Sequence, residues 1–275
     1  MAPLPDDSAW FYYPNTGAAA FFSAFFGLLG VGISFRAWQG GLKKFYWVEL
    51  IGVLWEVAGF AVRAAAHDRT TDVGLFAAQQ SLIVLAPLWI AGGIYLICGR
   101  IMAAVSKKRR IFGIPVRRIA LIFVTCDIVT LLVQVSGTSI AAGVEWEGSQ
   151  ADVGSHIITG GLAAQTVTLV FFIAIIVNFA GARLPFAAKR NVHWLPGFRS
   201  AFWSSLMILL RCVYRLIEFA MGVDGYLFEH EWPFYVIEAL PMAVAVCGLA
   251  LVYPPHYLQE AENSENIEVR DAEMS

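Results

Sequence analysis

Residues 211–242 read RCVYRLIEFAMGVDGYLFEHEWPFYVIEALPM, two apolar runs joined by a short acidic loop. Arg211, Arg215 and Glu218 are spaced at helical intervals, so they lie on one face of a helix. Glu238 lies one turn inside the second run. A charged side chain within a membrane span costs several kcal/mol unless it is paired or hydrated, and it usually marks a functional site. The stretch therefore predicts a membrane bundle that shelters a polar cluster.

The composition of the whole chain is typical of a membrane protein. Of its 275 residues, 58% are hydrophobic and 15% are charged, and the mean hydropathy is +0.64. Soluble globular proteins contain about 25% charged residues. The four cysteines lie within apolar runs, which favours a role in core packing and predicts neither a disulfide framework nor a metal site. No linker or low-complexity segment divides the apolar runs, so we expect one membrane domain.

Seven apolar runs are long enough for membrane-spanning helices, which need about 20 residues each. The expected fold class is an all-α integral membrane protein with seven transmembrane helices. We expect residues 1–16 to form an extracellular segment, residues 17–255 the seven-helix domain, and the acidic residues 256–275 a disordered cytoplasmic tail. The predicted spans cover residues 17–35, 47–66, 76–99, 118–142, 154–180, 199–221 and 233–253.

The charges between the predicted spans alternate in sign. Segments 36–46, 100–117 and 182–198 contain Lys and Arg, whereas segments 143–153 and 222–232 contain Asp and Glu but no Lys or Arg. Cytoplasmic loops of membrane proteins carry an excess of basic residues. This pattern predicts an N-terminus outside the cell and a C-terminus in the cytoplasm.

The predicted spans contain more acidic than basic side chains away from their ends. There are three basic and four acidic side chains in these positions, so one carboxylate has no basic partner. It is either protonated because of desolvation or available to bind a cationic ligand. At a rise of about 1.5 Å per residue, Arg63, Arg215 and Glu238 fall at one level, roughly 7–10 Å outside the midplane. Polar residues within spans face the bundle interior or a hydrated cavity. The candidate ligand-binding residues are Glu56, Arg63, Gln80, Asp127, Gln134, Gln165, Arg211, Arg215, Glu218, Tyr235 and Glu238.

These residues resemble the pattern of the fungal RTA1-like family of seven-span proteins, also called lipid-translocating exporters, over about residues 10–257. The matching positions are Glu56, Gly59, Phe60 and Arg63 in the second span; Gln80, Ala86, Pro87, Leu88, Ile94, Tyr95, Gly99 and Arg100 in the third; Asp127, Gln134 and Gly137 in the fourth; Gly160, Gly161, Leu162 and Gln165 in the fifth; and Arg211, Arg215, Glu218, Gly222, Glu231, Tyr235, Glu238, Pro241 and Met242 in the last two.

Two positions depart from this pattern. The family usually has Asp where this chain has Glu238, which keeps the charge on a longer side chain. The sequence Tyr253-Pro254-Pro255 replaces the usual His-Pro-Gly after the last span. The resemblance implies the handling of lipid-like amphiphiles at a fungal plasma membrane. Members are linked to resistance to toxic amphiphiles, to the release of sphingoid bases and, in one case, to porphyrin traffic.

Three functions are compatible with these features. The first hypothesis is binding and export of an amphiphile, such as a sphingoid base or a sterol-like compound, through an outward-facing polar cavity closed by Arg63, Arg215, Glu218 and Glu238. No GxxxxGK sequence is present, so direct use of ATP is not expected. The first alternative is a membrane-embedded enzyme in which Glu56, Glu218 and Glu238 provide acid–base chemistry for a hydrophobic substrate. The second alternative is a ligand-binding receptor or stress sensor.

The expected partners are an amphiphilic small molecule or lipid, together with the membrane lipids around the bundle. No nucleic-acid partner is expected, and the oligomeric state is left open. No cofactor is expected either; retinal, for example, requires a buried Lys for its Schiff base. All lysines lie in the predicted cytoplasmic segments: Lys43, Lys44, Lys107, Lys108 and Lys189.

Overall fold

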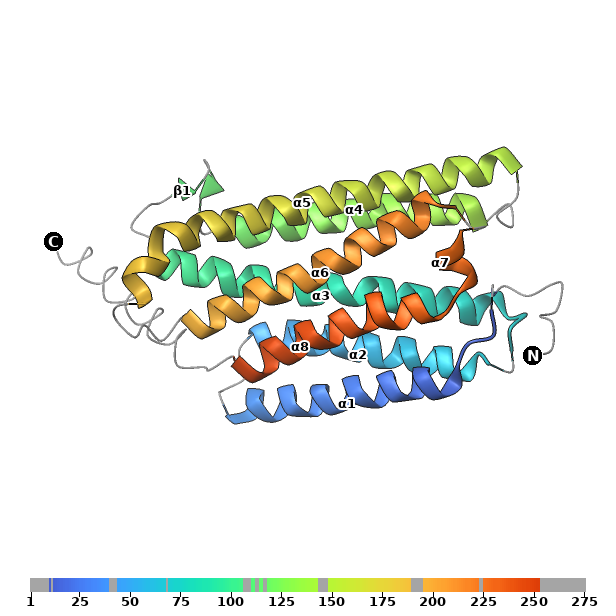
Figure 1. The fold of residues 1–275 in the computed structure, drawn as a ribbon, viewed down its shortest axis with the longest axis horizontal. Coiled ribbons are helices and arrows are strands. Elements are labelled where there is room, and N and C mark those ends of the chain that lie inside the picture. The colour runs from blue at the N-terminus through green and yellow to red at the C-terminus, as the bar shows by residue number, and fades with distance from the viewer. Residues whose placement is uncertain are drawn as a thin grey trace.

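The computed structural model shows a bundle of long helices that lie side by side (Figure 1). It describes residues 10, 12–39, 44–67, 69–105, 110–111, 114–115, 118–142, 148–188, 195–222 and 225–252. The acidic segment 256–275 and the sequence Tyr253-Pro254-Pro255 lie outside the described residues. The expectations for these segments therefore stay predictions.

The bundle consists of α1 (Thr16–Gln39), α2 (Lys44–Ala65), α3 (Val73–Val105), α4 (Ile119–Ala142), α5 (Gly148–Ala188), α6 (Leu195–Ala220), and the consecutive elements η2 (Phe234–Ala239) and α8 (Leu240–Val252). A short helix, α7 (Tyr226–Glu229), precedes η2. Strands β1 (Arg110–Ile111) and β2 (Ile114–Pro115) form a two-stranded antiparallel ladder between α3 and α4. The other described elements are helical, which confirms the all-α class.

Among the described residues, six helical segments are long and apolar enough to cross a membrane: the helices α1, α3, α4, α5 and α6, and the last segment, Phe234–Leu251. Helix α2 is not one of them. It has 22 residues and packs against α1 and α3, but Glu49, Glu56 and Arg63 are spread along its length. The predicted number of seven spans therefore depends on this charged helix.

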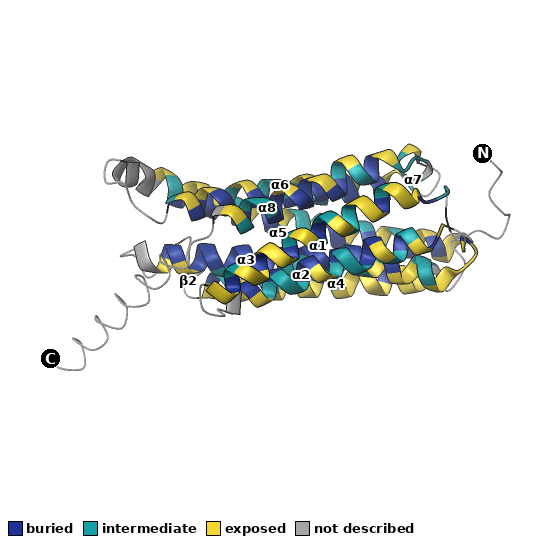
Figure 2. Cartoon of the chain, turned by 90° about the horizontal axis from the view of Figure 1, so that it is seen from below, coloured by how far each residue is buried: buried dark blue, intermediate teal, exposed yellow. Residues whose placement is uncertain are grey.

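Helix α3 occupies a central position, since it contacts α2, α4 and α6. Large apolar side chains point away from the bundle: Leu28 is 73% exposed, Trp38 77% and Val167 68%. Exposed residues follow the outer faces of the helices, and buried residues face inward (Figure 2). Lipid tails are as apolar as these side chains. Such a surface is therefore suited to a bilayer.

Glycines allow two pairs of helices to approach closely. A Cβ atom on Gly154 of α5 would lie 2.7 Å from the carbonyl oxygen of Gly137 on α4, and a Cβ atom on Gly137 would lie 2.8 Å from that of Gly154. At Gly59 of α2, a Cβ atom would lie 2.5 Å from the Cγ1 atom of Ile83 on α3. Small residues at such crossings let helix backbones come into contact in membranes. These glycines fix the separation of α4 from α5 and of α2 from α3.

The structure differs from the predicted spans in three places. Helix α3 runs from Val73 to Val105 and extends beyond the predicted span 76–99. Helix α5 has 41 residues and extends beyond the predicted span 154–180 at both ends. The last span is not a regular α-helix, because η2 is a π-helix in which the Leu240 N–H donates to the Tyr235 carbonyl oxygen. Pro241 has no N–H for the α-helical bond to Ile237. The π turn carries Glu238 and changes the direction in which this part of the helix presents its side chains.

Candidate functional site

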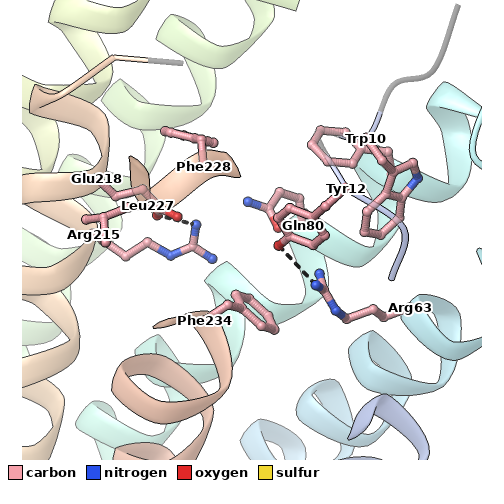
Figure 3. Close-up of a pocket in the computed structure, with 10 residues that line it drawn as sticks. Trp10, Tyr12, Arg63, Gln80, Arg215, Glu218, Leu227, Phe228 and Phe234 are labelled. Atoms are coloured by element: carbon pink, nitrogen blue, oxygen red, sulfur yellow. Dashed lines mark hydrogen bonds and ion pairs between the residues drawn. The ribbon is translucent and has the colours of Figure 1, made fainter. Parts of the chain in front are cut away.

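A pocket lies at the end of the bundle that carries residues 12–15 and α7 (Figure 3). Its empty volume is about 380 Å³, part of which is open to solvent. Figure 3 shows Arg215 and Glu218 on one side, Arg63 with Tyr12 and Trp10 on the other, and the Phe234 ring between them. The lining residues are Trp10, Tyr12, Arg63, Phe76, Gln80, Arg215, Glu218, Leu227, Phe228 and Phe234.

One wall of the pocket belongs to a buried network of charges. Arg211 donates from Nη2 to Oε1 of Glu238 at 2.8 Å, and Arg215 donates from Nη2 to the same oxygen at 2.7 Å. Arg215 also donates from Nη1 to Oε2 of Glu218 at 3.0 Å, and the other oxygen of Glu218 accepts from the hydroxyl of Tyr214. All these side chains are at most 5% exposed. The predicted common face of Arg211, Arg215 and Glu218 is thus present, and Glu238 joins it from η2.

Arg211 also donates a hydrogen bond to a backbone oxygen of α3 that has no partner within its own helix. Pro87 lies inside this helix and has no N–H to donate to the carbonyl oxygen of Ile83, four residues earlier. Arg211 Nη2 donates to that oxygen at 2.7 Å. A buried carbonyl without a partner is costly in a membrane, where no water replaces the lost bond. The proline therefore creates an acceptor on α3 that holds the α6 guanidinium in place.

This arrangement predicts that the effects of substitutions at Arg211 and Pro87 depend on each other. Arg211→Gln should lower the melting temperature of the detergent-solubilised protein less in a Pro87→Ala background than in the wild type. In that background, residue 87 has an N–H that satisfies the Ile83 oxygen. Residues that share a partner typically couple by about 0.5–3 kcal/mol. Equal losses in both backgrounds, measured by thermal unfolding of all four proteins, would rule out the shared acceptor.

The opposite wall of the pocket is built around Arg63, which is 2% exposed. Its guanidinium donates to Glu231 Oε1 at 2.8 Å, to the Tyr12 hydroxyl at 3.0 Å and to the Tyr235 hydroxyl at 3.1 Å. It also donates to Gln79 Oε1 at 3.2 Å. Of the four residues expected to close the cavity, Arg63, Arg215 and Glu218 line this pocket and Glu238 does not. Among the described residues, Arg63 forms its ion pair with Glu231.

The segment before α1 packs across this wall. The Asn15 N–H donates to both carboxylate oxygens of Glu231, at 2.9 and 3.0 Å. The Arg63 guanidinium carbon lies 4.2 Å from the Phe234 ring centroid and 5.3 Å from that of Trp10. Burial raises the pKa of Tyr12 above its ordinary value, against the attraction of the nearby guanidinium, so this residue stays a neutral phenol. Two aromatic residues of the N-terminal segment, Trp10 and Tyr12, thus help to enclose a buried cation.

The remaining candidate residues do not line the pocket. Asp127 of α4 accepts a hydrogen bond from the Tyr95 hydroxyl of α3 at 2.9 Å. Gln134 of α4 donates to Gln165 of α5 at 2.8 Å. These residues therefore make two separate polar contacts, one between α3 and α4 and one between α4 and α5. Glu56 is 1% exposed, and its Oε1 atom has no hydrogen-bond partner among the described residues.

Sequence reasoning missed several residues at the pocket. Glu231 was assigned to a polar loop, and Gln79 was passed over in favour of its neighbour Gln80, which lines the pocket and accepts a bond from Gln79 at 2.8 Å. The sequence offered one local signal for this part of the pocket. It was the cluster of aromatic residues around Trp10 and Tyr12, which comes just before α1. Nothing in the local spacing connects Arg63 with Glu231, because 168 residues separate them.

Apolar outer faces, six helical segments of spanning length and a buried network of arginines and glutamates together define an integral membrane protein. The chain belongs to the family described as RTA1 like protein, whose pattern it matches over residues 50–261. The resemblance inferred from the sequence is therefore confirmed.

Three relatives from Saccharomyces cerevisiae illustrate the family. The sphingoid long-chain base transporter RSB1 is 26% identical over 253 residues, which cover 78% of this chain and 65% of the relative. Protein RTM1 is 30% identical over 200 residues, covering 70% and 62%. Protein RTA1 is 28% identical over 273 residues, covering 88% and 84%. The chain thus spans less than two thirds of the transporter's length, and no solved structure matches it.

Proposed function

We propose that the chain binds and translocates a lipid-like amphiphile with a cationic amine head group, and that the pocket between Arg63 and Arg215 receives this head group. The observation that carries the proposal is the carboxylate of Glu218, which lines a pocket together with aromatic rings and the guanidinium groups of Arg63 and Arg215. Both guanidinium groups are already paired with carboxylates. A sphingoid base carries an amine beside hydroxyl groups. The relative named as a sphingoid long-chain base transporter supports a head group of this kind.

The pocket lining has the chemistry that an amine requires. The faces of aromatic rings attract cations, and proteins commonly bind alkylammonium groups in aromatic cages. Here the aromatic rings lie next to a carboxylate. We expect the amine to lie between Glu218 and the ring of Phe234 and a hydroxyl of the head group to bond with Gln80. The aromatic lining residues are Trp10, Tyr12, Phe76, Phe228 and Phe234.

The pocket is partly open to solvent, so its empty volume of about 380 Å³ includes space outside the protein surface. We expect it to receive only the polar head group, while the long alkyl chain lies outside it. The apolar side chains of Leu227 and Phe228 line the pocket from α7, next to the exposed Trp232 and Tyr226. We propose that the alkyl chain leaves past α7 toward the lipid.

We further propose seven crossings, with α2 as the seventh, and an N-terminus outside the cell. By the order and alternating direction of the helices, the bases Arg36, Arg100, Arg118 and Arg199 lie at one end of the bundle. The base Arg69 and the acids Asp72 and Asp152 lie at the other. Cytoplasmic ends carry the excess of bases. The pocket then faces outward, and α2 can cross because its charges are buried against neighbouring helices. The proposed location is the fungal plasma membrane.

Glu218→Gln tests the amine site directly. The amide keeps the shape: its oxygen can accept from Arg215 and its NH2 group can donate to the Tyr214 hydroxyl. Arg215 also keeps its ion pair with Glu238, so the protein should fold. Loss of the carboxylate should weaken the binding of a radiolabelled sphingoid base at least tenfold, which corresponds to about 1.4 kcal/mol. An N-acetylated sphingoid base has no charge and should bind wild type and variant equally. Equilibrium binding to the purified protein measures all four affinities.

Asp152→Asn is the matched control, because this exposed carboxylate lies at the same end of the bundle and outside the pocket. It should leave both affinities unchanged. Equal affinity of the wild type for the charged and acetylated lipids would contradict an amine site. Mass spectrometry of the recovered lipid adds a second criterion: an unchanged mass is expected for translocation, whereas a new mass would favour the membrane-embedded enzyme.

A further inference from the structure

Glu56 on α2 is a fully buried carboxylate beside the pocket network but not part of the pocket lining. It is 1% exposed, and within the described part of the chain its Oε1 atom has no hydrogen-bond partner. The same holds for Oε2 of Glu238 and Nη1 of Arg211. Glu56 interacts electrostatically with Arg211, Arg215 and Glu238. It therefore belongs to the charge network without being bonded into it.

The count of charges makes Glu56 the surplus group. Within the part of the chain that the structure describes, the ion pairs near the pocket join three guanidinium groups, of Arg63, Arg211 and Arg215, to three carboxylates. Those carboxylates belong to Glu218, Glu231 and Glu238. The bonded groups are thus neutral as a set. With Glu56 ionised the set carries one negative charge, and with Glu56 protonated it carries none.

No other charged group in the neighbouring helices can balance Glu56. Helix α1 contains one charged residue, Arg36, in its last turn at the opposite end of the bundle. Helix α3 contains only Arg100, which lies well beyond Ile83, the residue of α3 that meets Gly59 of α2. Helix α8 contains no charged residue. The groups that face Glu56 are therefore the two arginines of α6 and Glu238 of η2.

We propose that Glu56 is a proton-binding site whose occupation competes with the cationic head group. This inference rests on the proposed function. An ionised Glu56 supplies the single negative charge that a bound ammonium group neutralises, and a proton on Glu56 removes that charge. Two ligands that neutralise the same charge oppose each other, and each lowers the affinity of the other by the same factor. Release of one ammonium as one proton enters leaves the net charge of the network unchanged.

The consequence for translocation is an exchange of protons for amphiphile. A proton that reaches Glu56 expels the ammonium group. Loss of that proton restores the negative charge, so the network can bind the next ammonium group. The driving force is then the proton gradient across the membrane. The chain contains no phosphate-binding GxxxxGK sequence, and this exchange needs none. The proton and the ammonium group can compete without touching each other. The positive charge of either one is enough to neutralise the surplus carboxylate.

The proposal is tested by counting protons during binding. Purified protein in weakly buffered detergent at about pH 7, where an alkylamine is fully protonated, is mixed with a sphingoid base and a pH indicator dye. The wild type should release protons as the base binds, and its affinity should fall as the pH is lowered. Glu56→Gln, which resembles the protonated state, should release none. Its affinity should be weaker and independent of pH.

Glu49→Gln is the matched control. Glu49 lies seven residues before Glu56 on the same face of α2 and is also 1% exposed, but it does not interact with the pocket network. This variant should release protons as the wild type does. Proton release by Glu56→Gln, or its equal loss in both variants, would overturn the assignment to Glu56.

A second measurement separates the failure of this inference from failure of the proposed function. If the wild type binds no sphingoid base, infrared titration of the unliganded protein still detects a protonated carboxyl group through its carbonyl band. That band should lose one component in Glu56→Gln. If the base binds to the wild type without proton release, the pocket is an amine site and the proton site at Glu56 is wrong.

Discussion

Glu238→Gln is expected to destabilise the protein more than any other single substitution in the pocket network. One oxygen of Glu238 accepts from both Arg211 and Arg215, at 2.8 and 2.7 Å, and the side chain is 1% exposed. The amide removes the charge that both guanidinium groups share. Breaking a buried ion pair typically costs about 3–5 kcal/mol, because the remaining charge has no compensation. We expect a clear drop in melting temperature and loss of sphingoid-base binding.

The melting temperature can be followed with a thiol-reactive dye, because Cys98 is buried and becomes accessible on unfolding. Glu238→Asp is the control that keeps the charge, and the resemblance to the family places Asp at this position. It should recover most of the stability and binding that Glu238→Gln loses. A Glu238→Gln protein that melts and binds like the wild type would contradict a structural and binding role for this carboxylate. A protein that binds normally but no longer converts a lipid would instead indicate an enzyme.

Gly154→Ala is expected to have the second large effect, at a site remote from the pocket. The added Cβ atom would lie 2.7 Å from the carbonyl oxygen of Gly137 and 2.8 Å from the Cβ atom of Ala141. Neither neighbour can move without shifting the backbone of α4. Overpacking of this kind typically costs about 1–3 kcal/mol. We expect a lower melting temperature and a smaller yield of monodisperse protein in size-exclusion chromatography.

Gly160→Ala provides a control with the opposite expected sign. A Cβ atom at Gly160 meets nothing within 4 Å, so the substitution adds no clash. Alanine is favoured over glycine inside a helix by about 1 kcal/mol in peptide hosts. Gly160→Ala should therefore leave the melting temperature unchanged or raise it. A Gly154→Ala protein as stable as Gly160→Ala would show that α4 and α5 do not cross as closely as the structure indicates.

The fold was largely predictable because its signals are local. A helix must be apolar along its lipid-facing length, so the runs of hydrophobic residues located α1, α4 and α6 to within a few residues. The spacing of Arg211, Arg215 and Glu218 predicted their common face, since neighbours on a helix surface follow from the helical period alone. The π turn in η2 was not predicted, because periodicity cannot show where a helix widens.

The candidate site was predictable only in part. Arg63, Gln80, Arg215 and Glu218 were all selected from the sequence, and all of them line the pocket. Asp127, Gln134 and Gln165 were selected by the same criterion of polarity within a span, yet they make separate contacts away from the pocket. A polar side chain within a predicted span indicates that the residue faces the interior of the bundle. It does not indicate which of several interior positions that residue occupies.

By itself, the sequence determined the membrane class, the family and the residues that must avoid lipid, because these depend on composition and helical period. The tertiary structure decided the partners. It paired Arg63 with Glu231, gave Arg211 the Ile83 oxygen freed by Pro87, and left Oε1 of Glu56 without a hydrogen-bond partner among the described residues. The physical reason is that ion pairs and hydrogen bonds form at about 3 Å. Which groups reach that distance depends on how separate helices cross.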